Sequence, residues 1–167
     1  MTHIFILIAT AAALTVTSAW AADKRDQTFI KDAIEGNLAE VQMGKLAQDK
    51  GQSDGVKSFG QMLVTDHSDA NQKATAIANQ IGVTPPTEPN AKQKAMYDKM
   101  SKLSGDAFDR AFAKAMVQDH KQDIGKFQQE AKKQNDPVAE FASQTLPTLQ
   151  KHLQAAESLT NNKSTSR

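Results

Sequence analysis

The sequence predicts an all-α protein built as a four-helix bundle of two helical hairpins. Apolar residues recur at steps of three and four over four long segments, which is the period of an amphipathic helix. No segment shows the sustained alternation of β-branched residues that is typical of a strand. Short turns join the first two and the last two segments, whereas a much longer connection separates the two pairs. These observations together indicate two hairpins that pack side by side.

The first hairpin is predicted from one break between two long helical segments. A helix over residues 26–50 is expected to end at Gly51, since glycine is common just past a helix end. Ser53 or Asp54 is expected to cap the next helix, because either side chain can accept a hydrogen bond from a free N–H of the first turn. This second helix is expected to end at Ile81, before a glycine.

The connection between the hairpins contains a non-helical stretch and a short extra helix. Residues 82–90 cannot be helical, because three prolines remove backbone donors and restrict the residues before them. A short helix is expected over residues 91–103, ended by Ser104 and Gly105. A crossover of roughly twenty residues lets the helices on either side run parallel, which is the connectivity of ferritin-like bundles rather than of up-and-down bundles.

The second hairpin is predicted from a helix over residues 106–134, a turn at 135–136 and a final helix. Asp136 is the expected cap of that final helix. Pro137 would occupy its first helical position, where the missing N–H is not needed. The final helix is expected to reach Leu159.

The two ends of the chain are predicted to lie outside the bundle domain, which would cover residues 22–160. Residues 1–21 are predicted to be a signal peptide, because an apolar run ends in the small-x-small site Ala19-Trp20-Ala21. Cleavage after Ala21 would place the mature protein in the periplasm. The alternative is that residues 4–20 stay as a membrane anchor. The polar residues 161–167 are expected to be disordered.

The composition excludes several functional classes. The 167-residue chain has no cysteine, so a thiolate nucleophile, a disulfide frame and a zinc–thiolate site are all excluded. The formal net charge of +1 leaves no basic excess that would attract nucleic acid. We therefore expect no nucleic-acid partner and no permanent membrane span. The partner classes that remain are another envelope protein and a second copy of the chain.

Three of the four histidines lie on the apolar stripes of three different helices. His67, His120 and His152 each have apolar residues at helical spacing on the same face. The first helix has no histidine, but Glu40 lies on its apolar face. All four residues fall near the middle of their helices, so their side chains can meet on the bundle axis.

These four side chains together form a candidate metal site. Burial drives a carboxylate and an imidazole toward their neutral forms, whereas a divalent cation takes carboxylate and neutral imidazole as ligands. Three nitrogens and one oxygen suit Zn, Fe, Cu, Mn or Ni. Gly36 and Gly44 lie one turn before and after Glu40, which indicates either a close helix approach or room beside the carboxylate. The alternative is a metal-free hydrogen-bond network that fixes the register of the helices.

Further residues are candidates for a supporting role at this site. Asp66 and Asp119 each precede a histidine and point about 100° away from it. They are therefore either partners of a neighbouring helix or solvated side chains. Met116 and Met43 lie close to the candidate ligands and could add a soft ligand that favours copper, although methionine is more often a flexible filler of the core.

The histidine segments also carry a family resemblance. The motifs are "GQMLVTDHSDAN" (60–71), "MVQDH" (116–120) and "LPTLQKHL" (146–153). From about Phe29 to Leu159 the chain resembles the bacterial exported proteins grouped as domain of unknown function 4142. The resemblance implies a ferritin-like fold and a location in the periplasm or at the outer membrane, and it implies no established reaction.

The wider ferritin-like group includes di-iron proteins, which use a Glu-x-x-His pattern on two helices. Here Val64, Val117 and Leu149 stand three positions before the histidines, so ferroxidase or oxygenase activity is not implied. One metal ion at most fits the ligand count. The leading hypothesis is an exported bundle that holds one transition metal ion, as a binding or stress-related protein. The alternatives are a metal-free envelope module that contacts a partner, and redox or hydrolytic catalysis, which needs a substrate cleft that the sequence does not show.

Overall fold

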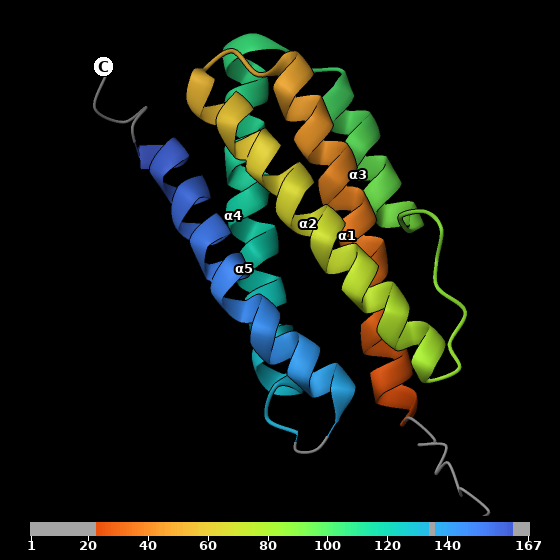
Figure 1. Ribbon diagram of the computed structural model, residues 1–167. Helices are drawn as coiled ribbons and strands as arrows, with labels where there is room; N and C mark the ends of the chain where they lie inside the picture. The colour runs from red at the N-terminus through yellow and green to blue at the C-terminus, as the bar shows by residue number, and fades with distance from the viewer. Residues whose placement is uncertain (1–22, 134–135, 162–167) are drawn as a thin grey trace, which may run out of the picture.

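A computed structural model describes residues 23–133 and 136–161, and it confirms the all-α bundle (Figure 1). Within this part of the chain there are five helices and no strands. They are α1 (Lys24–Lys50), α2 (Asp54–Gln80), α3 (Ala91–Ser101), α4 (Gly105–Glu130) and α5 (Pro137–Asn161). The predicted signal peptide lies outside the described residues, as does the predicted tail except Asn161, which is the last residue of α5.

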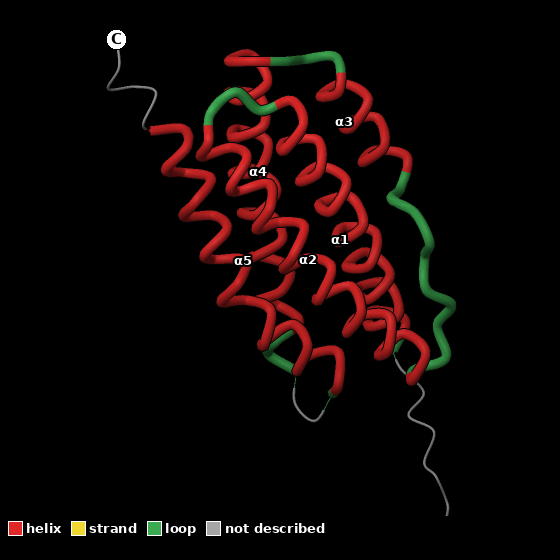
Figure 2. The backbone as a smooth tube through the Cα atoms, turned by 45° about the horizontal axis from the view of Figure 1, so that its top comes forward, coloured by secondary structure: helices red, strands yellow, loops and turns green. Residues whose placement is uncertain are grey.

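The four long helices form two hairpins, α1–α2 and α4–α5, as the turns in the sequence predict (Figure 2). The connection after α2 runs back along α1, so α3 lies beside α1 and α4 starts at the end of the bundle where α1 and α2 are joined. At that end both carboxylate oxygens of Asp109 accept hydrogen bonds, from the backbone N–H of Gln52 at 2.8 Å and of Ser53 at 3.0 Å. Therefore α2 and α4 run parallel, which is the predicted crossover connectivity.

The two predicted caps, those of α2 and α5, are confirmed. The Ser53 hydroxyl accepts from the N–H of Val56, so Ser53 is the cap of α2 and Asp54 is its first residue. Asp136 likewise accepts from the N–H of Val138 at the start of α5. The short helix α3 has a reciprocal capping box, in which Asn90 and Gln93 each satisfy the other's backbone N–H.

The predicted end of α4 at residue 134 is wrong, because α4 ends at Glu130. The next backbone bonds, Lys132 N–H to Gln129 and Lys133 N–H to Glu130, span three residues instead of four. This tighter winding closes the helix early. It also brings the ammonium of Lys133 beside the carboxylates of Glu130 and Asp26.

The two glycines beside Glu40 have different roles. A Cβ atom added to Gly44 would lie 2.6 Å from the carbonyl oxygen of Gly60, so α1 and α2 approach closely at this point. A Cβ added to Gly36 would have only Gln93 Nε2 nearby, at 4.0 Å, so there is room at that position. The predicted close helix approach is therefore found at Gly44, and the predicted room is found at Gly36. The close contact at Gly44 fixes the register that places Asn37 opposite His67.

The core consists of two apolar clusters, one near each end of the bundle. The first includes Leu46, Phe59, Leu63, Phe108, Phe112 and Met116. The second includes Ile30, Ile34, Ala74, Phe127, Phe141 and Leu149. Polar side chains of the candidate site are buried between these clusters. None of the helices in the described ranges has the length and hydropathy that a membrane crossing requires.

Candidate metal centre

The structure brings His67, His120 and His152 together in the middle of the bundle, one each from α2, α4 and α5. One ring nitrogen of each lies within 4.8 Å of the others. The ring centroids are 5.2 to 5.9 Å apart, and each residue is at most 5% exposed. Three imidazoles from both hairpins therefore share one small, buried volume.

Two of the three rings are oriented by partners that can only accept a hydrogen bond. His120 Nδ1 lies 2.9 Å from the backbone carbonyl oxygen of Met116, and His152 Nε2 lies 2.8 Å from Oδ2 of Asp66. A carbonyl or carboxylate oxygen has no proton to give, so each of these ring nitrogens must carry one. In a neutral imidazole the other nitrogen then presents a lone pair.

The two lone pairs of these rings face each other. His120 Nε2 and His152 Nδ1 are 3.3 Å apart. With both rings neutral there is no proton between these atoms, so the contact is stable only if a cation or an added proton lies there. Two nitrogens bound at about 2.0–2.1 Å to one tetrahedral ion would themselves be about 3.3 Å apart. The observed separation therefore fits two ligands of a single metal ion.

His67 supplies a third lone pair. Its Nδ1 donates to Oδ1 of Asn37 at 2.9 Å, and its Nε2 is buried with no hydrogen-bond partner. A buried polar atom without a partner costs about 1–3 kcal/mol. Coordination to a metal ion would satisfy this nitrogen, whereas the described protein groups around it do not.

The electrostatics of the site keep all three rings neutral. Burial lowers the pKa of His120 and of His152, in each case against smaller opposing effects of nearby groups. Burial, together with the other two histidines, holds the pKa of His67 well below its usual value. Since only a neutral imidazole can bind a metal, this environment favours the ligand form of every ring.

The family model for the domain of unknown function DUF4142 matches residues 11–159, a range that includes all three of these histidines. The chain belongs to this family. No curated protein and no solved structure matches it.

In this DUF4142 protein, Glu40 does not join the histidine group. Its side chain is only 5% exposed, and its Oε2 has no hydrogen-bond partner, but its carboxyl is not among the ligand atoms that come within 4.8 Å of one another. Instead it lies beside Asp119. Burial, followed by the charge and hydrogen bond of Asp119, raises the pKa of Glu40 well above its usual value.

The α1 residue that contacts the histidines is Asn37, which sequence reasoning missed. Asn37 and Glu40 lie on the same face of α1, one turn apart. However, Asn37 and His67 lie equally far from Gln52 in the turn between their helices, whereas Glu40 is closer to that turn. The same count of positions could therefore have identified Asn37, had an amide been considered as a partner for a histidine.

The supporting residues differ in their roles. Asp66 is a partner of a histidine on a neighbouring helix, as one of the two predicted alternatives requires. Asp119 is exposed and forms a hydrogen bond with Glu40, and its charge also acts on His120. Met116 offers its carbonyl oxygen to His120, and its side chain packs in the first core cluster together with that of Met43.

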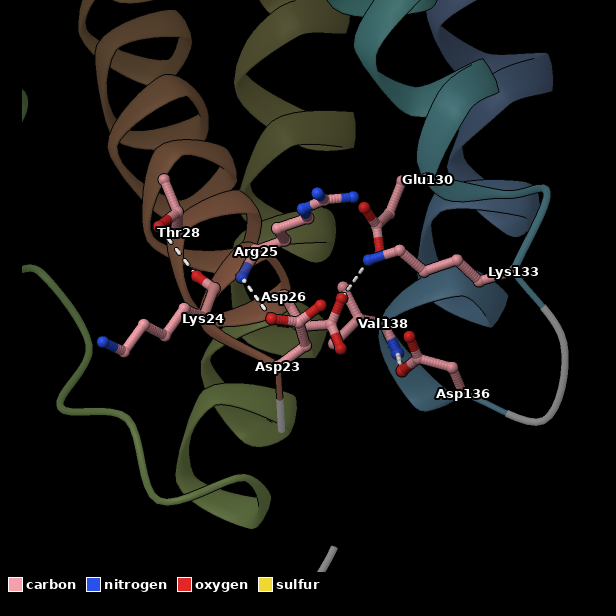
Figure 3. A network of polar contacts seen from close by, with 9 residues as sticks. All are labelled: Asp23, Lys24, Arg25, Asp26, Thr28, Glu130, Lys133, Asp136 and Val138. Carbon is pink, nitrogen blue, oxygen red and sulfur yellow. Dashed lines mark hydrogen bonds and ion pairs between the residues drawn. The ribbon is translucent and has the colours of Figure 1, made fainter. Parts of the chain in front are cut away.

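A second group of ligand-type side chains closes one end of the bundle (Figure 3). Carboxylate oxygens of Asp26, Glu130 and Asp136 lie within 4.8 Å of one another. The ammonium of Lys133 forms an ion pair with Asp26 and lies 2.8 Å from Oε1 of Glu130. This group ties the start of α1 to the turn between α4 and α5.

Proposed function

We propose that this protein binds one divalent transition metal ion through His67, His120 and His152. The observation that carries the proposal is the orientation of the three rings. Each has one nitrogen held by an oxygen atom. The other nitrogens of His120 and His152 face each other, and that of His67 is buried in the same group without a partner. Histidines that bind metals are commonly held in this way, by a carboxylate or carbonyl on the far nitrogen.

The ligand set narrows the choice among the metals that the sequence suggests. Three imidazoles suit Zn, Cu, Ni and Fe, whereas Mn favours oxygen ligands. Glu40 would complete a set of three nitrogens and one oxygen only if its carboxylate left Asp119 and approached the rings. We therefore propose three histidine ligands, with water as the remaining ligand and Glu40 as a nearby buried acid.

Metal titration of untagged protein tests this function. Co²⁺ should bind with a stoichiometry of one per chain and give the visible absorption of a tetrahedral nitrogen site. His67→Ala should abolish this absorption. Leu63→Ala is the matched control, since Leu63 is fully buried one turn away and its loss should lower stability without removing a ligand. A wild-type protein that binds none of Zn, Cu, Ni, Fe, Mn or Co would refute the proposal.

The second candidate function is a metal-free envelope module that works by contacting a partner. The observation that favours it is the continuous chain of contacts from Met116 through His120 and His152 to Asp66. A single proton between the two rings would complete this chain, and Asp66 would balance the charge. In that case a chelator would leave the melting temperature unchanged, while His120→Ala would still destabilise the protein because its partners lose hydrogen bonds.

We also propose that the protein is exported and acts in the periplasm or at the outer membrane. The support is the sequence pattern of residues 1–21, which ends at the site before Ala22. The mass of the protein isolated from the periplasm should correspond to a chain that begins at Ala22. An intact N-terminus in the membrane fraction would show instead that residues 4–20 are an anchor.

A further inference from the structure

A small cavity lies next to the three-histidine site, on the side where α1 faces α4. Its volume is about 40 Å³, enough for a few water molecules. The residues that matter here are Asp32, Gly36 and Asn37 of α1, Asp123 and Lys126 of α4, and His67 of α2. Asp32 and Lys126 are exposed, whereas Asn37 and His67 are buried, so the cavity leads from the surface toward the site.

The helix packing explains why the cavity lies there. α1 packs closely along α2, with backbone contact at Gly44 and Gly60, whereas the contacts between α1 and α4 are sparse. Gly36 adds to the open space, because a side chain at this position would meet little else. The protein is therefore more loosely packed here than between α1 and α2.

The two buried polar residues that line the inner end of the cavity each have an atom that the described protein groups do not satisfy. His67 Nε2 and Asn37 Nδ2 are both buried, and neither has a hydrogen-bond partner. His67 is 5% exposed and Asn37 is 6% exposed. The His67 lone pair needs a donor or a cation, the Asn37 N–H needs an acceptor, and a water molecule can serve either of them. This observation is independent of the acidic residues at the outer end.

The outer end of the cavity is acidic overall. Asp32 and Asp123 line it, and the only cation among the cavity-lining residues described is Lys126, whose Nζ lies 3.1 Å from Oδ1 of Asp123. Glu35 lies near Asp32, and Asp119 lies near Asp123, and both add negative charge. A recess lined by excess negative charge raises the local concentration of cations.

We propose that this cavity is the path by which a divalent metal ion reaches the three-histidine site. Asp123 is the first carboxylate that the ion meets, and Lys126 is the counter-ion that moves aside. This inference rests on the proposed metal-binding function, because it concerns the rate at which that site fills. It assigns positioning roles to residues that are not themselves proposed as ligands.

The first test blocks the cavity. Gly36→Met would fill it, whereas Gly125→Met is the matched control, since Gly125 is also a helical glycine with open space around it but does not line the cavity. Stopped-flow measurement of Co²⁺ uptake and of its release to a chelator gives both rate constants. Gly36→Met should slow both by the same factor, about tenfold, which corresponds to a barrier increase of about 1.4 kcal/mol. The equilibrium Kd should remain that of the wild type.

The second test changes the charge at the outer end. Lys126→Gln should speed Co²⁺ uptake by about tenfold and Asp123→Asn should slow it by a similar factor. Lys121→Gln is the control, because Lys121 is on the same helix, is similarly exposed at 57% against 58%, and also pairs with one carboxylate. High salt should reduce both effects, since it screens the exposed charges. Lys126 is on the surface, so Lys126→Gln can still test the entry path if Gly36→Met does not fold.

The outcomes separate the entry path from the metal site itself. Wild-type protein that binds no metal would refute the proposed function, and the entry path with it. Wild-type protein that binds metal, with Gly36→Met and Gly125→Met filling at the same rate, would refute the path alone. Equal uptake rates for Lys126→Gln and Lys121→Gln would also refute it. A change in Kd without a change in uptake rate would show that these residues act on the bound state instead.

Discussion

The three-histidine site and the carboxylate group at the bundle end are both clusters of mostly buried side chains of the kinds that bind metals. The carboxylate group of Asp26, Glu130 and Asp136 already has a cation, the ammonium of Lys133 (Figure 3). The three histidines have no such cation within the group, and their free lone pairs face one another.

This difference teaches how to tell a structural cluster from a binding site. Where the chain supplies an opposite charge, as Lys133 does, ion pairs hold the helices together. Where the chain supplies only lone pairs, as in the three-histidine site, the group needs an added proton or metal ion. Proximity of ligand-type residues is therefore a weaker indicator than the balance of donors and acceptors around them.

The largest expected effect is the loss of metal from the wild type. Metal at one thousand times its Kd stabilises the folded state by about 4.1 kcal/mol, and a chelator should remove this contribution. His152→Ala should show no chelator effect, whereas Lys133→Met should show the same increment as the wild type. Melting curves with Zn²⁺ and with chelator measure this. A smaller chelator effect in Lys133→Met would mean that the two clusters are not independent.

The next effect concerns the carboxylate group. Lys133→Met leaves two buried carboxylates without their cation, which should lower the free energy of unfolding by about 2 kcal/mol, since Lys133 itself is partly exposed. Added Ca²⁺ should restore part of this loss, because oxygen ligands suit that ion. Urea unfolding measures both changes. The exposed neighbour provides the control Lys132→Met, which should be close to neutral.

A smaller effect is expected for the residue behind His152. Asp66→Asn removes the carboxylate that fixes the ring, and such partners typically change metal affinity by at least about tenfold. Competition with a chromophoric chelator measures the Kd. Asp69→Asn is the matched control, since Asp69 is on the same helix and exposed. Equal affinities for the two variants would show that Asp66 does not orient the ring.

The smallest effect is expected for Glu40. Burial and Asp119 raise its pKa, and its carboxyl lies outside the histidine group. Glu40→Gln therefore removes no proposed ligand, and we expect the metal Kd to change by no more than about threefold. Isothermal titration of Zn²⁺ into both proteins checks this. A loss of affinity of about one hundredfold would show that the Glu40 carboxylate reaches the metal as a fourth ligand.

The sequence predicts the inward direction of the three histidines because each lies on an apolar stripe whose period is set by the helix itself. The apolar phase of α1 does not by itself predict which of its residues meets them, since only the count of positions from the turn distinguishes Asn37 from Glu40. Asn37 and Glu40 share a face, and the contact between Gly44 and Gly60 fixes the level at which α1 meets α2.

The carboxylate group was not predicted, because its members are far apart in the chain. Asp26 and Lys133 are 107 positions apart, and no local pattern marks either residue. Their contact also depends on the early end of α4, which is set by hydrogen bonds of the last turn rather than by an apolar period. The side of its own helix on which a residue lies can be predicted from the sequence. Contacts between helices depend in addition on the register of the helices and on where each helix ends.

The attachment of α4 at both of its ends has a consequence for the lifetime of a bound ion. Asp109 near its start holds the α1–α2 turn, and Lys133 just beyond its last turn holds α1, while its last two turns face the cavity. A helix fixed at both ends can bow outward between them on a timescale of microseconds to milliseconds. Global unfolding of small domains is commonly far slower, up to days. An ion could therefore exchange many times during the life of one folded molecule, without the two hairpins ever coming apart.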